Sequence, residues 1–161
     1  MEFELRPRQG VPPVLLGATL AEARSAIEGL GFLEVRDFRR SPDEPDALFF
    51  HGPVDRVSGF AYGDEDGRVE AIELANPNPR NEPGQGQDQV TYSKLDVFSS
   101  TARDVIRTLG AETEIDSYGD SLMVPDLFMQ FWRGGEDHDR VDDNGDPTFF
   151  NSVLLAIEGY Y

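Results

Sequence analysis

Residues 76–89, NPNPRNEPGQGQDQ, divide the chain into two stretches that resemble each other. The segment has no aliphatic or aromatic side chain, so we expect it to add nothing to a hydrophobic core. Its three prolines and two glycines also exclude a regular helix or a central strand. The sequence therefore predicts a polar linker or long surface loop between the halves 1–75 and 90–161.

The composition indicates a single domain that folds without disulfides. With 161 residues, 39% of them hydrophobic, the chain is long enough to bury a core, and it contains no cysteine. Its 31 acidic and 14 basic residues give a net charge of −17, which repels nucleic acid and anionic lipid and favours a basic partner. Acidic residues near the start do not match a signal peptide, and no apolar run reaches about 18 residues. We expect a cytoplasmic protein with no cofactor and no membrane partner.

The first half is predicted to form a helix followed by an antiparallel meander. Thr19 and Glu22 form a capping box, and apolar residues at helical spacing follow until Gly31, which predicts a helix over residues 20–30. Residues 63–67, GDEDG, predict a hairpin turn. The strands expected in this half are 2–6, at an edge, and 47–51, 57–62 and 68–74.

The second half repeats this order. Ser99 or Ser100 is expected to cap a helix that ends at Gly110, and aligning Gly31 with Gly110 places Leu30 on Leu109. The strands expected here are 90–97, 121–124, 127–133 and 149–158, the last of them central and covered on both faces. The prediction is an α+β fold over residues 1–161, with two similar halves and a sheet covered by helices. The alternative is that this common order of elements arose without duplication.

Residues 14–31, VLLGATLAEARSAIEGLG, resemble the opening of the first repeat in the family of the β-lactamase inhibitory protein. The chain is also similar to small acidic bacterial proteins at residues 62–70, 131–133 and 159–161. The first resemblance implies two copies of a helix and sheet whose concave face and loops enter a partner enzyme. The cysteine pairs of that family are absent, and VFSST replaces LGAT in the second copy.

Residues 134–147, GGEDHDRVDDNGDP, form the segment in which the two halves differ most. A loop of this length in a compact domain is usually functional or disordered. One interpretation is an acidic finger that enters a basic cleft, and the other is a solvated loop of an acidic protein. A calcium site is disfavoured because Gly145 precedes Asp146 instead of following it, and no glutamate stands at the twelfth position.

Aromatic and arginine side chains beside this segment are candidate interface anchors. Trp132 and Arg133 precede it, and the alternative for Trp132 is packing against the sheet and helices. The predicted partner-binding residues are Trp132, Arg133, Glu136, Asp137, Asp139, Asp142, Asp143 and Asp146. The two histidines, His51 and His138, are too few for a metal site, and no serine lies in a Gly-x-Ser-x-Gly context. No catalytic residue and no metal ligand is therefore predicted.

These patterns favour a binding protein over an enzyme. Between residues 112 and 146 there are 11 acidic residues and 2 arginines, so over half of the net charge lies in about a fifth of the chain. The leading hypothesis is an immunity or inhibitor protein that occludes the basic active-site cleft of a bacterial toxin, nuclease or other enzyme. The alternatives are a carboxylate-dependent hydrolase and a structural or regulatory subunit.

Overall fold

A computed structural model describes residues 1–53, 56–77, 88–115, 121–132 and 149–160 of the chain. The described residues form two α-helices, one short 3-10 helix and thirteen strands, so the predicted α+β class is confirmed. The helices are α1 (Leu20–Gly29), α2 (Ala102–Leu109) and η1 (Pro125–Leu127). The strands are β1 (Glu2–Glu4), β2 (Gly10–Val11), β3 (Val14–Leu15), β4 (Glu34–Phe38), β5 (Ala47–His51), β6 (Ser58–Gly63), β7 (Val69–Ala75), β8 (Gln89–Tyr92), β9 (Leu95–Asp96), β10 (Glu114–Ile115), β11 (Ser121–Val124), β12 (Met129–Trp132) and β13 (Ser152–Ala156).

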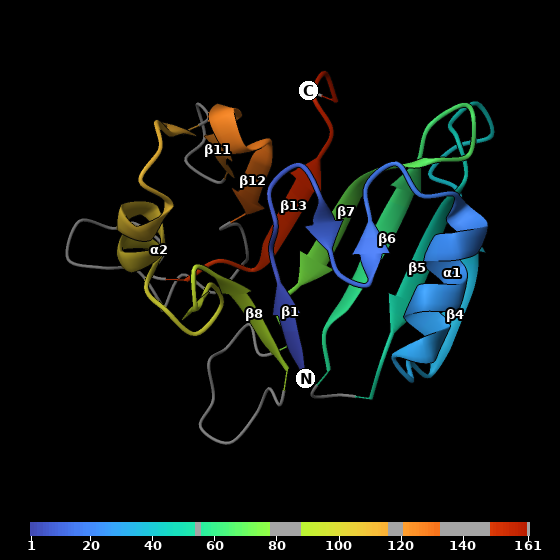
Figure 1. The fold of residues 1–161 in the computed structure, drawn as a ribbon, viewed down its shortest axis with the longest axis horizontal. Coiled ribbons are helices and arrows are strands. Elements are labelled where there is room, and N and C mark those ends of the chain that lie inside the picture. Colours follow the sequence, from blue (N-terminus) through green and yellow to red (C-terminus); the bar gives the residue numbers. More distant parts are fainter. Residues whose placement is uncertain (54–55, 78–87, 116–120, 133–148, 161) are drawn as a thin grey trace.

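The main sheet has eight strands within the described part of the chain, in the order β10-β11-β12-β13-β7-β6-β5-β4 (Figure 1). Every neighbouring pair is antiparallel. Two meanders, β4–β7 and β10–β13, meet where β7 pairs with β13. The last strand of the chain therefore lies in the middle of the sheet, as its apolar sequence predicts.

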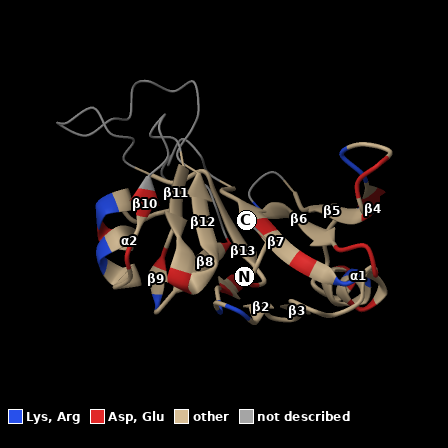
Figure 2. Ribbon diagram, turned by 90° about the horizontal axis from the view of Figure 1, so that it is seen from above, with Lys and Arg blue, Asp and Glu red and all other residues tan. Residues whose placement is uncertain are grey.

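Both α-helices, α1 and α2, cover the same face of this sheet (Figure 2), together with the β2–β3 hairpin and the small sheet β1-β8-β9. Ile27 of α1 and Val105 of α2 are buried in one hydrophobic core with Phe131 and Leu155 of the sheet. No described helix lies on the other face of the sheet. Within the described residues, helices thus cover the sheet on one face only, so the cover on both faces that was predicted for residues 149–158 is not seen there. The other face is called the open face below.

Helix α1 begins and ends as predicted. The Thr19 hydroxyl accepts a hydrogen bond from the Glu22 N–H, and the Glu22 carboxylate accepts one from the Thr19 N–H, which completes the capping box. These hydrogen bonds lower the pKa of Glu22. Gly31 follows the C-cap Leu30 with a φ of 76°, a conformation that glycine adopts without strain.

The N-cap of helix α2 lies one residue after Ser100 and two after Ser99, the two predicted caps. Thr101 is its N-cap and accepts a hydrogen bond from the Asp104 N–H, so Ser99 and Ser100 are wrong as caps. Thr101 has an acidic residue three positions later, whereas Ser99 is followed at that spacing by Ala102 and Ser100 by Arg103. The predicted end is confirmed, because Gly110 adopts a left-handed conformation at the C-cap.

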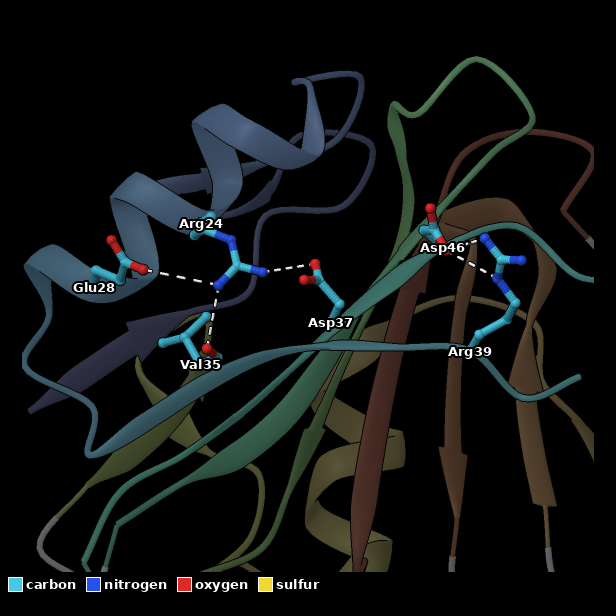
Figure 3. Close-up of polar contacts among 6 residues, drawn as sticks. All are labelled: Arg24, Glu28, Val35, Asp37, Arg39 and Asp46. Carbon is cyan, nitrogen blue, oxygen red and sulfur yellow. Dashed lines mark hydrogen bonds and ion pairs between the residues drawn. The ribbon is translucent and has the colours of Figure 1, made fainter. Parts of the chain in front are cut away.

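Strand β4 was absent from the sequence-based prediction, because three of its five residues are charged. It pairs with β5 at the edge of the sheet. Arg24 of α1 holds it in place, donating to the Val35 carbonyl oxygen at 3.1 Å and to the Asp37 carboxylate at 2.6 Å (Figure 3). In the same view Arg39 donates to Asp46, which joins the end of β4 to the start of β5. Arg36 lies within this edge strand, and a charged side chain there also discourages pairing with another chain.

Four predicted strands are shorter than expected. Residues 2–6 reduce to β1 (Glu2–Glu4), and residues 149–158 reduce to β13 (Ser152–Ala156). Residues 90–97 form the β8–β9 hairpin in the small sheet, because Ser93 and Lys94 turn the chain with φ of 49° and 70°. The strand predicted at residues 127–133 begins only at Met129, since Leu127 belongs to η1 and Phe128 has a φ of 50°. The short strand β10 was also missed, since two residues are too few for an alternating pattern.

The C-terminal end of residues 76–89 is part of the folded domain, which corrects the prediction that the whole segment is a polar linker. The Asp88 side chain is fully buried. It accepts hydrogen bonds from the Met1 amino group at 2.8 Å, from Arg56 Nε at 2.5 Å and from the Val57 N–H at 3.1 Å. At the other end, the Asn76 N–H donates to the Asn151 carbonyl oxygen. A sequence without apolar residues therefore still supplies a buried charge.

Candidate functional site

Three transverse rows of side chains cross the open face, because residues paired across neighbouring strands point to the same side of a sheet. The first row is Ser121, Trp132, Ser152, Ala75, Ser58, His51 and Glu34. The second row is Glu114, Met123, Gln130, Leu154, Glu73, Phe60, Phe49 and Arg36. The third row is Ala156, Ala71, Tyr62, Ala47 and Phe38.

Aromatic rings on β4, β5 and β6 form a continuous cluster on this face. The ring of Phe60 lies 5.1 Å from that of Phe38, 5.2 Å from that of Phe49 and 5.5 Å from that of Tyr62. All except Tyr62 are partly exposed. The guanidinium of Arg36 lies 4.8 Å above the ring of Phe49. Such a cluster offers a preformed apolar surface with cations at its margin.

Trp132 lies at the far side of the same face and is 46% exposed. It ends β12 in the first row, where its carbonyl oxygen accepts a hydrogen bond from the Asn151 N–H. The structure therefore places Trp132 at the surface of the sheet, not beneath the helices. The other predicted partner-binding residues, Arg133, Glu136, Asp137, Asp139, Asp142, Asp143 and Asp146, lie outside the described residues.

A pocket of about 150 Å³ lies at the third-row end of the open face. The loop between β4 and β5 forms one wall, and Tyr160 near the C-terminus forms another. The lining residues are Arg40, Glu44, Pro45, Asp46, Ala47, Tyr62, Gly63, Glu70 and Tyr160. The sequence gives no sign that Tyr160 meets Arg40 and Tyr62, because these residues lie on three separate segments.

Comparisons of the chain with protein-family models, curated proteins and solved structures found no match.

Charged groups hold Tyr62 in place at the base of the pocket. Its hydroxyl donates to the Glu73 carboxylate at 2.7 Å, and the guanidinium of Arg40 lies 4.4 Å from the centre of its ring. Burial raises the pKa of Tyr62, and the hydrogen bond to Glu73 raises it further. A hydrogen bond with Tyr62 in turn raises the pKa of Arg40. Arg40 and Phe60 thus both lie against the Tyr62 ring.

Glu70 is a partly buried carboxylate of this pocket. Among the described residues it has no ion pair and no side-chain hydrogen bond. Burial raises its pKa, and the negative charge of Asp64 raises it further. Asp46, by contrast, is paired with Arg39. The pocket therefore carries an excess of negative charge at Glu70.

The first row also brings together Glu34, His51 and Ser58 on three adjacent strands, an arrangement that spacing along the sequence did not reveal. In the described part of the chain no side-chain hydrogen bond joins His51 to Ser58, and Glu34 pairs with Arg36. A nucleophile, a base and an orienting acid need mutual hydrogen bonds, so these residues are neighbours without a catalytic geometry.

The described residues contain no group of three or more histidine, aspartate or glutamate side chains positioned to hold a metal ion. They also contain no helix that is both long and apolar enough to cross a membrane.

Proposed function

We propose that this chain is an acidic protein-binding module of the immunity or inhibitor type, which occludes the basic active-site cleft of a bacterial toxin or another enzyme. The single observation that carries the proposal is the open face, which presents Trp132 at one side and the Phe38–Phe49–Phe60 cluster at the other. A sheet face of this kind is usually covered by another layer. Here a partner protein supplies that layer.

The chemistry of the surface supports a basic partner. Tryptophan and tyrosine are the residues that most often dominate binding energy at protein interfaces. The net charge of −17 speeds the encounter with a positively charged partner and rejects acidic proteins. The six carboxylates of residues 134–147 follow Trp132 in the sequence, so the exposed ring and much of the charge belong to neighbouring parts of the chain.

Within this proposal, Trp132→Ala should raise the Kd for the partner by about 30-fold, because an anchoring tryptophan contributes about 2 kcal/mol or more. The partner would first be captured on the tagged protein from its host at low salt and released at high salt, then identified by mass spectrometry. Isothermal titration calorimetry would measure the Kd.

The control for this variant is Leu15→Ala. Leu15 is 47% exposed, closely matching Trp132, but lies in β3 on the helix side of the sheet. We expect its Kd to stay within about twofold of the wild-type value. Equal losses in both variants, or capture of no basic protein at either salt concentration, would contradict the proposed function.

We also propose that the two halves are a diverged duplication, as in the repeats of the β-lactamase inhibitory protein family. Each half has a hairpin, then a helix, then four antiparallel strands: β2–β3, α1 and β4–β7 in the first, β8–β9, α2 and β10–β13 in the second. Pro53 and Pro125 lie between the second and third strands of their meanders. The last strands of the two meanders pair with each other in an antiparallel manner, as related units would.

A chain of residues 1–77 alone is then expected to dimerise, with β7 of one copy replacing β13 beside the other. Analytical ultracentrifugation would measure the mass of the folded fragment. A folded monomer would contradict the duplication, because it would show that the exposed edge of β7 does not pair with the same edge of a second copy.

The hydrolase and the structural or regulatory subunit remain alternatives to this proposal. Neither is favoured by a specific feature of the described residues.

A further inference from the structure

We infer that the pocket between the β4–β5 loop and Tyr160 binds a primary ammonium group of the lysine side-chain type. That the bound lysine belongs to a protein partner rests on the proposed function. The binding of an ammonium group by the pocket does not. The pocket lies on the open face, diagonally across from Trp132, so one partner could contact both.

The pocket contains a negative charge, that of Glu70, which favours the binding of a cation. The Glu70 carboxylate is partly buried and lacks an ion pair within the described chain, and the neighbouring charge of Asp64 works against its ionised form. A partly buried carboxylate of this kind is stabilised when a cation approaches it. Glu44 lines the same pocket and adds a second negative charge within its walls.

The size and walls of the pocket fit an alkyl chain that ends in a charge. A volume of about 150 Å³ is larger than one water molecule needs, and the walls include the apolar surfaces of Pro45, Ala47 and Tyr160. A lysine stem packs along such walls while its ammonium remains with the carboxylates.

The arrangement of Tyr62 favours an ammonium over a guanidinium. A guanidinium gains much of its binding energy from stacking on an aromatic face or from a planar bidentate contact. Phe60 stacks against the Tyr62 ring and the Arg40 guanidinium already lies over it, so a second guanidinium would compete with Arg40 for that ring. An ammonium is a compact charge with three donors and needs no free ring face.

Arg40 limits the affinity of this pocket for an ammonium group, because its positive charge also lines the pocket. Its guanidinium is held against Tyr62, so it neutralises part of the pocket without reaching an ion pair with Glu70. Weak binding of an isolated ammonium compound is therefore expected, with a Kd of about 1–10 mM.

The probe for this inference is Nα-acetyl-lysine methylamide, titrated into the full chain and followed by ¹⁵N amide chemical shifts. We expect saturable shifts at Ala47, Gly63 and Glu70. The neutral Nε-acetylated probe should produce none. Glu70→Gln should weaken binding about tenfold, as the loss of one partly buried ion pair does. Glu65→Gln is the matched control, since it removes the same charge from an exposed residue of the adjacent hairpin turn and should change the Kd less than twofold.

Three results would overturn the inference: no saturable shift at these amides, equal binding of the neutral probe, or equal losses in the Glu70→Gln and Glu65→Gln variants. Ala47→Leu fills the pocket without changing charge and should also abolish the shifts, so it separates the pocket from a general attraction to the acidic surface. These outcomes are independent of the proposed function, because the probe binds or fails to bind whether or not a protein partner exists.

Discussion

Replacing Asp88 by Asn is expected to lower the free energy of unfolding by about 3 kcal/mol, the usual cost of removing one partner from a buried ion pair. The side chain of Asp88 is fully buried and joins Arg56, the Val57 N–H and the Met1 amino group. Asparagine keeps the shape but removes the charge that these donors require. Urea denaturation at pH 7 would measure the loss.

The pH dependence of this variant has a defined sign. Burial raises the pKa of Asp88, but the hydrogen bonds from the amino group, Arg56 and Val57 outweigh it and hold the pKa below its ordinary value. A lowered pKa contributes stability that is fully present above the unfolded pKa of about 4 and is lost as the pH falls through the folded pKa. The difference between the wild type and Asp88→Asn should therefore shrink as the pH is lowered below about 4.

Asp37→Asn is the matched control. Asp37 also pairs with an arginine, Arg24, but its side chain is 85% exposed. An exposed ion pair contributes little, so we expect a change within about 0.5 kcal/mol. If the two variants lose the same stability, burial of Asp88 is not what gives its ion pair its importance.

Gly59→Ala is the second change expected to have a large effect, a loss of about 3 kcal/mol. Gly59 lies in β6 opposite Leu74 of β7. A Cβ atom there would overlap the main-chain carbonyl oxygen of Glu73 and would lie 2.9 Å from the Phe50 ring. Strand β7 cannot withdraw readily, because it is paired with β13 on its other side. Thermal unfolding should show a decrease in Tm of about 6–12 °C.

Gly29→Ala provides the comparison for this glycine. Gly29 is the last residue of α1, and a Cβ atom there would meet nothing within 4 Å. The free energy of unfolding should stay constant or rise by up to about 1 kcal/mol, because alanine restricts the unfolded chain. A loss at Gly29 as large as that at Gly59 would exclude the steric explanation.

The candidate site was predictable only in part. Trp132 was named from its residue type and position, and the structure places it on the open face. The sequence did not predict the aromatic cluster, because Phe38, Phe49 and Phe60 come from three strands and meet only through the register of β4, β5 and β6. The pocket around Glu70 was missed for the same reason, since its walls come from separate segments of the chain.

The sequence by itself determined the elements whose signals are local. The Thr19–Glu22 capping box, the turn before Gly67 and the apolar runs of β5 and β13 depend on neighbours a few residues apart. Only the tertiary structure decided that Asp88, in a segment without apolar residues, is buried, and that β4, with three charges in five residues, is a strand. In both cases the stabilising partners are distant: Arg56 lies 32 residues from Asp88, and β5 and Arg24 hold β4 at the edge. Polarity along a chain indicates the average environment of a residue, but a buried charge or an edge strand depends on which donors the fold brings to it.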